Sequence, residues 1–563
     1  MKKLINDPRA VVREMLEGLA DLNPGQALLE GEDVVVRAGL PPYAARREVA
    51  IISGGGSGHE PAHAGYVGGG MLHAAVAGDV FTSPSADAVL AAIRAVAGPP
   101  GVLLIIKNYT GDRLNFGLAA ELARAEGIAV ETVVVADDVA LRETVEPERR
   151  RGIAGTVLVH KVAGAAAAAG LPLREVAQEA RAAASSLGTM GVALGPCTVP
   201  AAGRPGFTLG DDEVELGLGI HGERGVERTT LRRADDLVDT ILGTILADRA
   251  PDRGDRVALL VNGLGGTPPM ELAIVARRAM ANLRGRGLTV ARAWSGNLLT
   301  ALEMPGMSLT VLPVDDVRLS RLDAPTAAPA WPGDGRIGPA RAIVRHPAAA
   351  AAEMLPDRPL SPSEAVIRRR ALAAAAALEG AERRLTELDA AAGDGDLGAS
   401  MMRAAAALRA LPEAAWSSPP GVVLTRMADA LRRAIGGSSG PFYATALLRA
   451  AQTLPETPAA SDWSAALTAG VEAVAELGGA KPGDRTLIDA LRPAAAVFAA
   501  GLAAGRSAAS AWGEAVAAAQ EGAAATARMH PRLGRASYLG ARAIGTVDAG
   551  AAAVATWMQA VWP

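Results

Sequence analysis

The sequence predicts a multidomain protein in which a two-lobed α/β domain is followed by an all-helical domain. Three observations indicate this: the length of 563 residues, a first part in which short apolar runs alternate with amphipathic segments, and a last part in which such runs nearly vanish. One hydrophobic core seldom serves a chain of this length, so two to four domains are expected. We place the α/β domain at 1–323 with its lobes dividing near 185, a linker at 324–363 and the helical domain at 364–563.

The α/β domain is predicted from apolar runs that each precede a polar or glycine-rich loop and usually a helix-length segment. The runs are REVAIIS, VLLIIKN, AVETVVVAD, RVALLVNG and SLTVLPVD. Short apolar runs that alternate with helices are typical of βαβ units. We therefore expect largely parallel sheets, with ligand sites at the carboxyl ends of the strands.

The linker and the helical domain follow from a change in texture. Proline-rich stretches such as DAPTAAPAWPGDGRIGP have no sustained period, which predicts a semi-rigid linker. Further on, segments such as VVLTRMADALRRAI and TLIDALRPAAAVFAAGLAAG place apolar residues near 3.6-residue spacing. The expected architecture is an antiparallel helical bundle or barrel with glycine-rich phosphate loops between its helices.

Charge and cysteine content exclude several classes of protein. A net charge of −4 argues against a general nucleic-acid or anionic-membrane binder. Cys197 is the only cysteine, which excludes intrachain disulfides and multi-cysteine metal sites. The first residues contain no apolar run of signal-peptide length, and the alanine-rich runs are too short to span a membrane. A cytoplasmic protein without nucleic-acid or membrane partners is expected.

A metal site is predicted in the stretch LDAAAGDGDLGASMM, which holds Asp389, Asp394 and Asp396. Gly393 and Gly395 break the helix, so that the three carboxylates can converge, and hard oxygen donors suit Mg²⁺. The spacing does not fit an EF-hand calcium loop. The alternative interpretation is a helix end followed by a solvated acidic turn.

Four glycine-rich segments at expected helix starts favour a magnesium–nucleotide site over that alternative. Backbone N–H groups at helix N-termini bind phosphate, and small residues allow close approach. The segments contain residues 397–400, then Gly436, Gly437, Ser438, Ser439 and Gly440, then Gly478, Gly479 and Lys481, and finally Arg535 and Asp548. The sequence has no Walker A motif and no protein-kinase HRD or DFG set, so the site would be a separate solution to phosphoryl transfer.

Three loops carry the polar residues of the α/β domain. SGGGSGHEPAHAGYVGGG puts His59 on a glycine–serine turn, and LLIIKNYTGDRLNFG ends a strand at Lys107 and then carries Asp112. GLGIHGERG surrounds His221 with four glycines, which allow another molecule to approach this imidazole closely.

Two alternative interpretations apply to these loops. A dinucleotide fingerprint GxGxxG does not fit, because His59 takes the place of the last glycine. For any one histidine the alternative is a structural hydrogen bond, and we favour it for His63, His73 and His160.

Seven motifs together resemble the single-chain, ATP-dependent dihydroxyacetone (glycerone) kinases over essentially the whole chain. In order they are SGGGSGHEPAHAGYVG, KNYTGDRLNFG, GLGIHGERG, GDGDLG, GGSSG, AKPGDRT and GRASYLG. The resemblance implies phosphorylation of dihydroxyacetone to dihydroxyacetone phosphate, with ATP as co-substrate. It implies that His221 attacks the C2 carbonyl and holds the substrate as a covalent hemiaminal, which glycerol cannot form. It casts Asp112 as the group that polarises the hydroxyl taking phosphate, and His59 as its acid/base or orienting partner.

The resemblance also implies the binding residues. The triose is bound around Gly56, Ser57, Gly58 and Lys107, and two Mg²⁺ are held by Asp389, Asp394 and Asp396. The nucleotide is surrounded by Leu397, Gly398, Ala399, Ser400, Ser438, Ser439, Gly478, Leu487, Arg535, Asp548, Ala549 and Gly550. Ala549 stands where many relatives have proline, which implies a less rigid nucleotide lid but removes no catalytic group.

Other functions use the same machinery. The substrate could be another short keto sugar such as erythrulose, or glyceraldehyde, and some related enzymes cyclise FAD as a side activity. Relatives with separate subunits keep a bound ADP and depend on a phosphocarrier protein, whereas fusion of the two halves favours free ATP. A carbonyl-binding regulator would be expected to lose the acidic triad. The resemblance further implies a homodimer built through the α/β domains.

Overall fold

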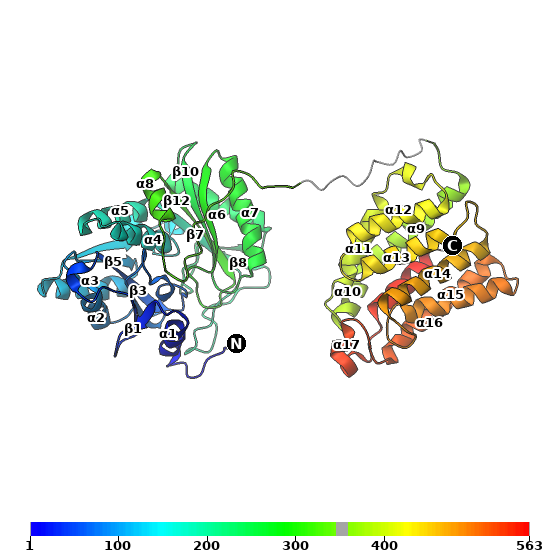
Figure 1. The fold of residues 1–563 in the computed structure, drawn as a ribbon, viewed down its shortest axis with the longest axis horizontal. Helices are drawn as coiled ribbons and strands as arrows, with labels where there is room; N and C mark the ends of the chain where they lie inside the picture. Colours follow the sequence, from blue (N-terminus) through cyan, green and yellow to red (C-terminus); the bar gives the residue numbers. More distant parts are fainter. Residues whose placement is uncertain (1, 345–357, 562–563) are drawn as a thin grey trace. The chain divides into compact units, whose positions relative to one another are not determined.

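The computed structural model describes residues 2–344 and 358–561. Backbone contacts divide the chain into two compact units, Met1–Val344 and Arg345–Pro563 (Figure 1). The first unit mixes helices with two sheets, and the second is helical. Among the described residues, no helix is long and apolar enough to cross a bilayer.

The first sheet has six strands in the order β1-β2-β4-β3-β5-β6. Its strands are β1 (Gln26–Leu28), β2 (Val34–Arg37), β3 (Ala50–Ser57), β4 (Ala74–Val80), β5 (Val102–Lys107) and β6 (Val130–Val135). The last four of these run parallel, whereas β1 and β2 form an antiparallel edge. The expected parallel sheet is therefore present here, and the loops after β3 and β5 lie at its carboxyl end.

The second sheet differs from the prediction because it is mainly antiparallel. Its order is β11-β10-β12-β7-β8-β9, and only β10 and β11 run parallel. The strands are β7 (Gly188–Ala193), β8 (Glu213–Leu216), β9 (Glu227–Thr230), β10 (Arg256–Gly263), β11 (Thr289–Gly296) and β12 (Gly306–Pro313). No helix lies between β7 and β8, between β8 and β9, or between β11 and β12. Neighbouring parallel strands need a crossover connection, usually a helix, whereas antiparallel strands can be joined by a loop alone. Apolar runs do not reveal this, because a buried strand reads the same in either direction.

Helices cover both sheets in layers. On the first sheet, α2 (Ala86–Val96) and α3 (Thr110–Ala125) pack on one face, and α4 (Thr156–Ala168) and α5 (Leu173–Ser186) pack on the other. The core that contains α4 and α5 also includes Ala258, Leu260 and Leu312 of the second sheet, so these helices lie between the sheets. The outer face of the second sheet is covered by α6 (Ala234–Arg249) and α7 (Pro269–Gly285).

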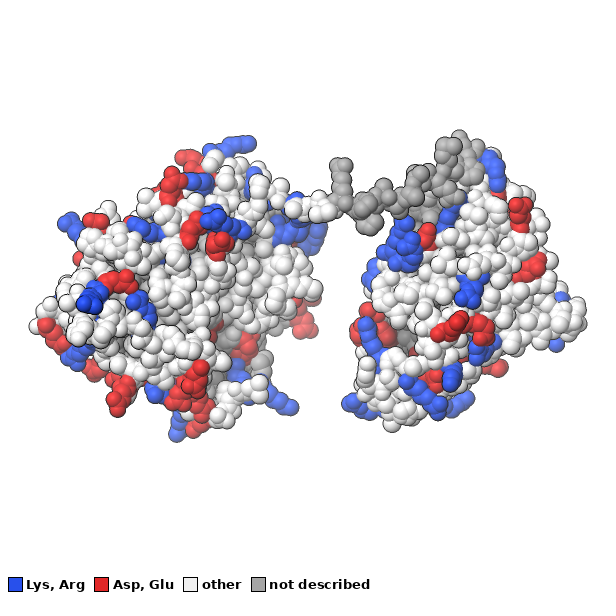
Figure 2. Space-filling model, in the orientation of Figure 1, with Lys and Arg blue, Asp and Glu red and all other residues white. Residues whose placement is uncertain are grey.

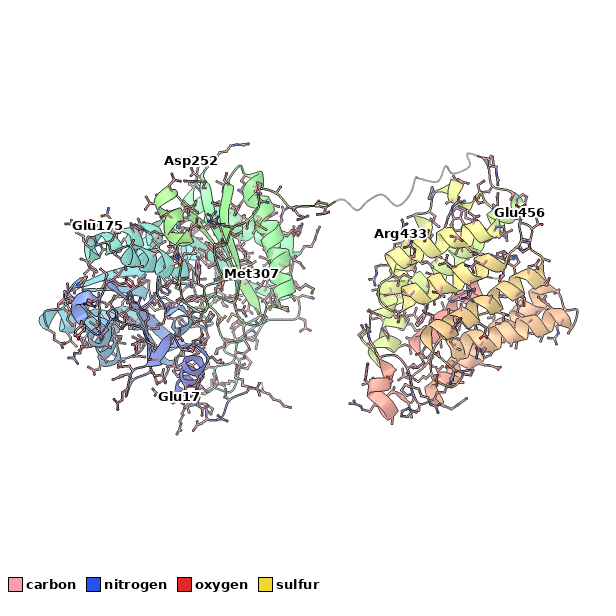
Figure 3. The ribbon with its side chains drawn as sticks, in the orientation of Figure 1. Glu17, Glu175, Asp252, Met307, Arg433 and Glu456 are labelled. Atoms are coloured by element: carbon pink, nitrogen blue, oxygen red, sulfur yellow. The ribbon has the colours of Figure 1, made fainter. Side chains whose placement is uncertain are left out.

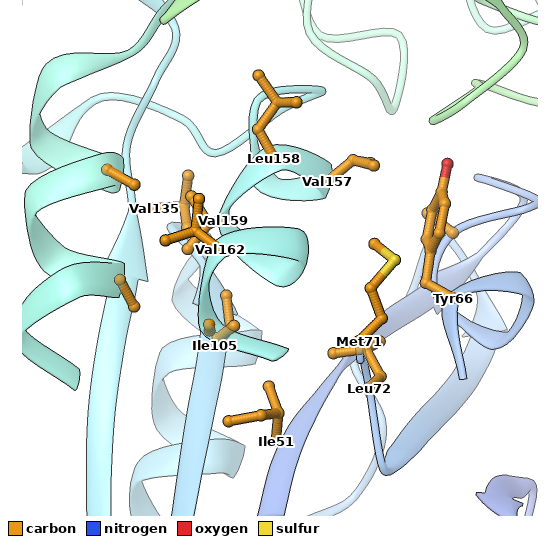
Figure 4. Packing of buried hydrophobic residues seen from close by; sticks show 14 of the residues in the cluster. Ile51, Tyr66, Met71, Leu72, Ile105, Val135, Val157, Leu158, Val159 and Val162 are labelled. Atoms are coloured by element: carbon orange, nitrogen blue, oxygen red, sulfur yellow. The ribbon is translucent and has the colours of Figure 1, made fainter. Parts of the chain in front are cut away.

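Branched aliphatic side chains dominate this shared core. Figure 4 shows Ile51 and Ile105 from the first sheet and Val157 and Val162 from α4 in one cluster. Each is at most 1% exposed. Burial of one such side chain stabilises the fold by roughly 1.5–3 kcal/mol, so the layer holds both sheets in place. Met307 of β12, labelled in Figure 3, is also buried.

Charged side chains lie at the surface of the units. Glu17 on α1 (Val11–Leu22) and Glu175 on α5 are labelled at the outside of the first unit in Figure 3. On the face shown in Figure 2, acidic and basic side chains are intermingled in each unit. This pattern agrees with the small net charge.

The first part of the predicted linker belongs to the α/β unit. After α8 (Asp316–Asp323), Trp331 is 9% exposed and packs on Trp294 with ring centroids 4.9 Å apart. A side chain at Gly68 or Gly70 would lie 2.4–2.5 Å from backbone atoms of this segment, so these glycines of GYVGGG allow the segment to pack closely. The proline-rich composition predicted a linker, but burial of the Trp331 ring favours packing of the segment on the α/β unit. Residues 345–357 of the predicted linker lie outside the described residues.

The second unit consists of helices. The first of them, α9, is capped by the side chain of Ser361, which forms a capping box with Glu364. The helices are α9 (Pro362–Gly380), α10 (Glu382–Ala390), α11 (Leu397–Arg409), α12 (Pro420–Ala434), α13 (Ser439–Thr453), α14 (Ala460–Gly478), α15 (Ile488–Ala503), α16 (Ala508–Ala525), α17 (Ala536–Leu539) and α18 (Ala549–Val561). Residues of α18 belong to both hydrophobic clusters of the unit. The helices also line an apolar cavity of about 510 Å³, whose wall includes Leu431, Trp463 and Trp512.

Candidate active site

Two histidines from different sheets meet in the α/β unit. His59 follows β3 and is fully buried, whereas His221 lies in the loop between β8 and β9 and is partly exposed. Their Nε2 atoms are 3.1 Å apart. The structure thus brings together two of the predicted catalytic residues, which are 162 positions apart in the sequence.

Fixed partners set the protonation of His59. Its Nδ1 lies 2.7 Å from the carbonyl oxygen of Thr300, which can only accept, so Nδ1 carries a proton. Burial, and then the charges of Lys107 and His221, lower the pKa of His59 well below its usual value. His59 is therefore neutral, and its Nε2 presents a lone pair toward His221.

Glu223 orients His221. Its Oε1 lies 2.9 Å from His221 Nδ1, and its Oε2 accepts a hydrogen bond from the backbone N–H of His221 at 2.9 Å. Burial alone would raise the pKa of Glu223, but the hydrogen bonds from His221 outweigh this effect and lower the pKa to about 2. A carboxylate therefore faces Nδ1. Because Nδ1 is held by Glu223, Nε2 is the nitrogen of His221 that is left to act as a nucleophile. A proton on His221 Nε2 can be donated to the lone pair of His59 Nε2, so the 3.1 Å contact holds one proton between the two rings.

Aromatic rings enclose this pair. Phe81 stacks on His59 with centroids 5.1 Å apart, and Tyr109 meets His221 edge-on at 4.5 Å. Burial raises the pKa of Tyr109 well above its usual value, so its hydroxyl stays neutral. Sequence reasoning missed these residues: Phe81 and Tyr109 reach the site only through contacts distant in sequence, whereas Glu223, two residues after His221, could have been found from its place in GLGIHGERG.

Lys107 and Asp112 lie next to the glycine turn. Lys107 ends β5 with no exposed surface, and Asp112 lies in the first turn of α3 with 4% exposed. Gly55 has a φ of +149°, and a side chain there would meet Lys107 Nζ at 2.5 Å and Asp112 Oδ2 at 3.3 Å, so both the backbone and the space favour glycine. Burial lowers the pKa of Lys107, opposed by the nearby charges of Asp112 and Glu60.

The predicted triose-binding turn is partly engaged by the protein itself. Ser57 Oγ donates to the carbonyl of Gly78 at 2.8 Å, and the N–H of Gly58 donates to Glu60 at 3.0 Å. Gly56 leaves no room for a side chain, because one would lie 2.5 Å from the backbone nitrogen of Thr82. These residues shape the turn around Lys107.

The predicted metal ligands converge in the helical unit. Asp389 lies in α10, Asp396 precedes α11, and one oxygen from each of Asp389, Asp394 and Asp396 lies within 4.8 Å of the others. Gly395 has a φ of +74°, which favours glycine at the turn between them. Three carboxylate oxygens in one turn fit Mg²⁺. Arg535 pairs with Asp394 and lies 3.9 Å from Asp396.

Helices begin at the four predicted phosphate segments. Their first residues are Leu397, Ser439, Ile488 and Ala549. Asp548 accepts a hydrogen bond from the N–H of Ala551 at 2.8 Å, and burial raises its pKa to about 6. A side chain at Gly550 would lie 3.5 Å from Leu487, so these two predicted nucleotide residues are neighbours.

Most of the other predicted nucleotide residues also lie at helix starts, but Gly478 is the last residue of α14. Gly398, Ala399 and Ser400 lie in the first turn of α11, and Ser438 is the residue before α13. The Cβ of a residue replacing Gly478 would lie 3.2 Å from the ring of Phe442 on α13. Gly478 therefore lies beside the first turn of α13.

Comparison with known proteins agrees with this two-site organisation. Residues 17–330 match the Dak1 domain and residues 391–562 match the DAK2 domain. The chain belongs to the dihydroxyacetone kinase family. It is 44% identical to human triokinase/FMN cyclase over 570 residues, which cover 100% of this chain and 98% of that protein. It is 38% identical to the D-erythrulose kinase of Mycolicibacterium smegmatis, over 100% of this chain and 98% of that one.

A solved structure of this kinase family shares the fold. The crystal structure of the dihydroxyacetone kinase from C. freundii in complex with AMP-PNP and Mg²⁺ matches with a TM-score of 0.63 and 36% identity, over 99% of both chains. The resemblance expected from the seven motifs is thereby confirmed, as is the order of a mixed α/β domain followed by a helical one.

Proposed function

We infer that the chain is an ATP-dependent dihydroxyacetone kinase that transfers the terminal phosphoryl group of ATP to a hydroxyl of dihydroxyacetone. The observation that carries this is His221, whose Nδ1 is held by Glu223 at 2.9 Å and whose Nε2 faces His59 at 3.1 Å. An imidazole held in this way is an oriented nucleophile for a carbonyl carbon. Similarity to kinases over the whole chain supports the same function.

Capture of the ketone uses the two histidines. His221 Nε2 forms a bond to C2 of the substrate, the carbonyl π bond breaks, and its oxygen takes up the proton held between His221 and His59. The positive charge that develops on the imidazole of His221 is stabilised by the Glu223 carboxylate at Nδ1. Glycerol has no carbonyl, so this step separates two substrates of nearly equal size.

Asp112 and Lys107 act on the hydroxyl group that receives phosphate. Asp112 accepts the hydroxyl proton as the oxygen attacks phosphorus, and Lys107 stabilises the negative charge nearby. Both are at most 4% exposed, so water competes little for these contacts.

In the helical unit, Asp389, Asp394 and Asp396 would hold magnesium, and bound magnesium would neutralise charge on the ATP phosphates. The helix starts at Leu397, Ser439 and Ala549 would direct N–H groups at those phosphates. Arg535 would exchange its carboxylate partner for a phosphate oxygen. We propose that two Mg²⁺ ions bind at this site, as the resemblance implies.

Other parts of the prediction also remain proposals. We propose that the predicted linker, 324–363, connects the two units by the part that follows the packed segment around Trp331 and precedes α9. We also propose that α9–α18 form a closed bundle or barrel. A cytoplasmic location stays a prediction from the sequence.

A homodimer built through the α/β units is proposed as well. Leu114, Leu118 and Leu122 on one side of α3 are 68%, 54% and 38% exposed. Exposed apolar surface of this kind is what a second copy of the chain would bury. Analytical ultracentrifugation of the protein and of Leu118→Glu tests this, and a monomeric wild-type protein at micromolar concentration would contradict it.

A flavin-cyclising side activity is the second candidate. The human relative is named triokinase/FMN cyclase, and the same magnesium–nucleotide site would serve both reactions. Another short keto sugar as the preferred substrate is supported by the relative named D-erythrulose kinase.

Steady-state ATP turnover tests the proposal against dihydroxyacetone, erythrulose, glyceraldehyde, glycerol and FAD. We expect ketose-dependent ADP formation without any phosphocarrier protein, no turnover of glycerol, and loss of turnover in His221→Ala. His530→Asn is the control, because His530 lies in the other unit and, among the described residues, makes one hydrogen-bond contact, from Nδ1 to the Pro531 carbonyl at 3.2 Å. Equal turnover of glycerol and dihydroxyacetone would contradict carbonyl capture.

A further inference from the structure

Lys107 depends on a histidine that the sequence suggested was only structural. Among residues 2–344, the ammonium group of Lys107 makes one hydrogen bond, to Nε2 of His63 at 3.1 Å. Lys107 has no exposed surface, and His63 is 6% exposed. A buried ammonium needs such acceptors, because water cannot solvate it.

The acceptor nitrogen of His63 is fixed by Ser53. The hydroxyl of Ser53 donates to the carbonyl of Ile105 at 2.7 Å, so its oxygen is free to accept from His63 Nδ1 at 3.4 Å. With the proton on Nδ1, the lone pair of neutral His63 lies on Nε2 and faces Lys107. Burial, and then the charge of Lys107, lower the pKa of His63 well below its usual value, which keeps the ring neutral.

The direction of this contact matters because the lysine stem is long and flexible. The Lys107 ammonium also lies against the glycine turn, where a side chain at Gly55 would lie 2.5 Å from Nζ and 3.3 Å from Asp112 Oδ2. Four other titratable groups face or influence Lys107: Asp112 from α3, Glu60 and His59 from the turn after β3, and His160 from α4. His63 is the one hydrogen-bonded to the ammonium.

We propose that His63, held by Ser53, is a positioning residue that aims the Lys107 ammonium at the Gly55–Asp112 end of the substrate site. This inference rests on the proposed kinase function. His63 stabilises the charged form of Lys107 through one acceptor atom, and that form supports Asp112 as the base.

The buried His73 provides a contrast. It is 2% exposed and has both ring nitrogens partnered, by the Ile51 N–H at 3.1 Å and by Glu48 at 3.0 Å. Neither partner belongs to the substrate site, so His73 fulfils the structural role expected of it. His63 differs because its partner is a functional group.

The test compares amide replacements of His63 in the full chain. Glutamine places an oxygen near the position of Nε2, whereas asparagine places one near Nδ1, so only His63→Gln keeps an acceptor for Lys107. We expect His63→Asn to lower kcat at least about tenfold and to move the alkaline limb of the pH profile to lower pH, because the ammonium loses its acceptor. His63→Gln is expected to stay within about threefold of the wild type with its profile retained, and His73→Gln measures the effect of altering a buried histidine elsewhere.

Two results would overturn the proposal: equal kcat and equal pH profiles for the asparagine and glutamine variants, or equal loss in both with unchanged thermal unfolding. An inactive wild-type protein would instead refute the proposed function. If either variant fails to fold, ¹⁵N NMR of histidine-labelled wild-type protein decides. Neutral His63 protonated at Nδ1 between pH 6 and 9 supports the proposal, and protonation at Nε2 refutes it.

Discussion

Replacing Glu223 by glutamine removes one charge and should move the proton of the His221 imidazole from Nδ1 to Nε2. Both carboxylate oxygens of Glu223 accept hydrogen bonds, from the backbone N–H of His221 and from its Nδ1, each at 2.9 Å. Glutamine has only one oxygen. The backbone N–H cannot change its role, whereas an imidazole can move its proton, so the amide oxygen turns to the backbone and the NH₂ group turns to Nδ1.

This orientation leaves His221 protonated on Nε2, the atom proposed to attack the ketone. A hydrogen bond to a charged group contributes about 1.5–3 kcal/mol, which corresponds to roughly 10- to 150-fold in kcat/KM for dihydroxyacetone. We expect a loss in that range or larger for Glu223→Gln, because the lone pair is lost as well. Initial rates of ADP formation measure it, and ¹⁵N chemical shifts of His221 report the tautomer.

A matched control lies in β8, the strand that precedes the loop of Glu223. Glu215 accepts from the N–H of Gly225 at 3.0 Å and from Arg228 at 3.0 Å, without contacting His221. Glu215→Gln is expected to affect stability more than kcat/KM. The reasoning is refuted if Glu223→Gln keeps wild-type kcat/KM, or if it loses activity while His221 remains protonated on Nδ1.

Three further predictions follow from other contacts. Asp394→Asn should lower ATP turnover at least about 100-fold while dihydroxyacetone still binds the α/β unit, as measured by calorimetry without nucleotide. Gly55→Ala places a methyl group 2.5 Å from Lys107 Nζ and should lower kcat at least about tenfold, whereas Gly127→Ala, also at positive φ but in open space, should change only the melting temperature. Burial lowers the pKa of His160 to about 3, so the unfolded chain binds more protons below its ordinary pKa of about 6.5, and stability should fall as the pH drops from 7 to 4. Urea midpoints across this range measure the loss, which should be smaller in His160→Leu; a midpoint independent of pH would contradict the prediction.

Local patterns predicted much of the architecture because their causes are local. Helices begin at Leu397, Ser439, Ile488 and Ala549, where glycine and serine mark the breaks between apolar periods. The three aspartates converge because Gly395 adopts a backbone angle that glycine favours. Both features depend on fewer than ten neighbouring residues.

Features that depend on distant contacts were not predictable in this way. The second sheet is mainly antiparallel because of which strands pair, and an apolar run such as SLTVLPVD does not record its partner. The tautomer of His59 depends on Thr300, 241 residues away, and the role of His63 depends on Lys107. Trp331 was placed in a linker because proline and alanine surround it, although its own ring is buried.

The carbonyl of Thr300 has a consequence for how this enzyme would lose activity. It follows the second sheet's β11, yet it sets the proton position of a histidine that follows the first sheet's β3. Partial denaturation that separates the two sheets would abolish activity while the strands of each sheet are still paired. The rate of the reaction would then report whether the two lobes are correctly packed, and it should decline at a lower urea concentration than the circular-dichroism signal of the secondary structure.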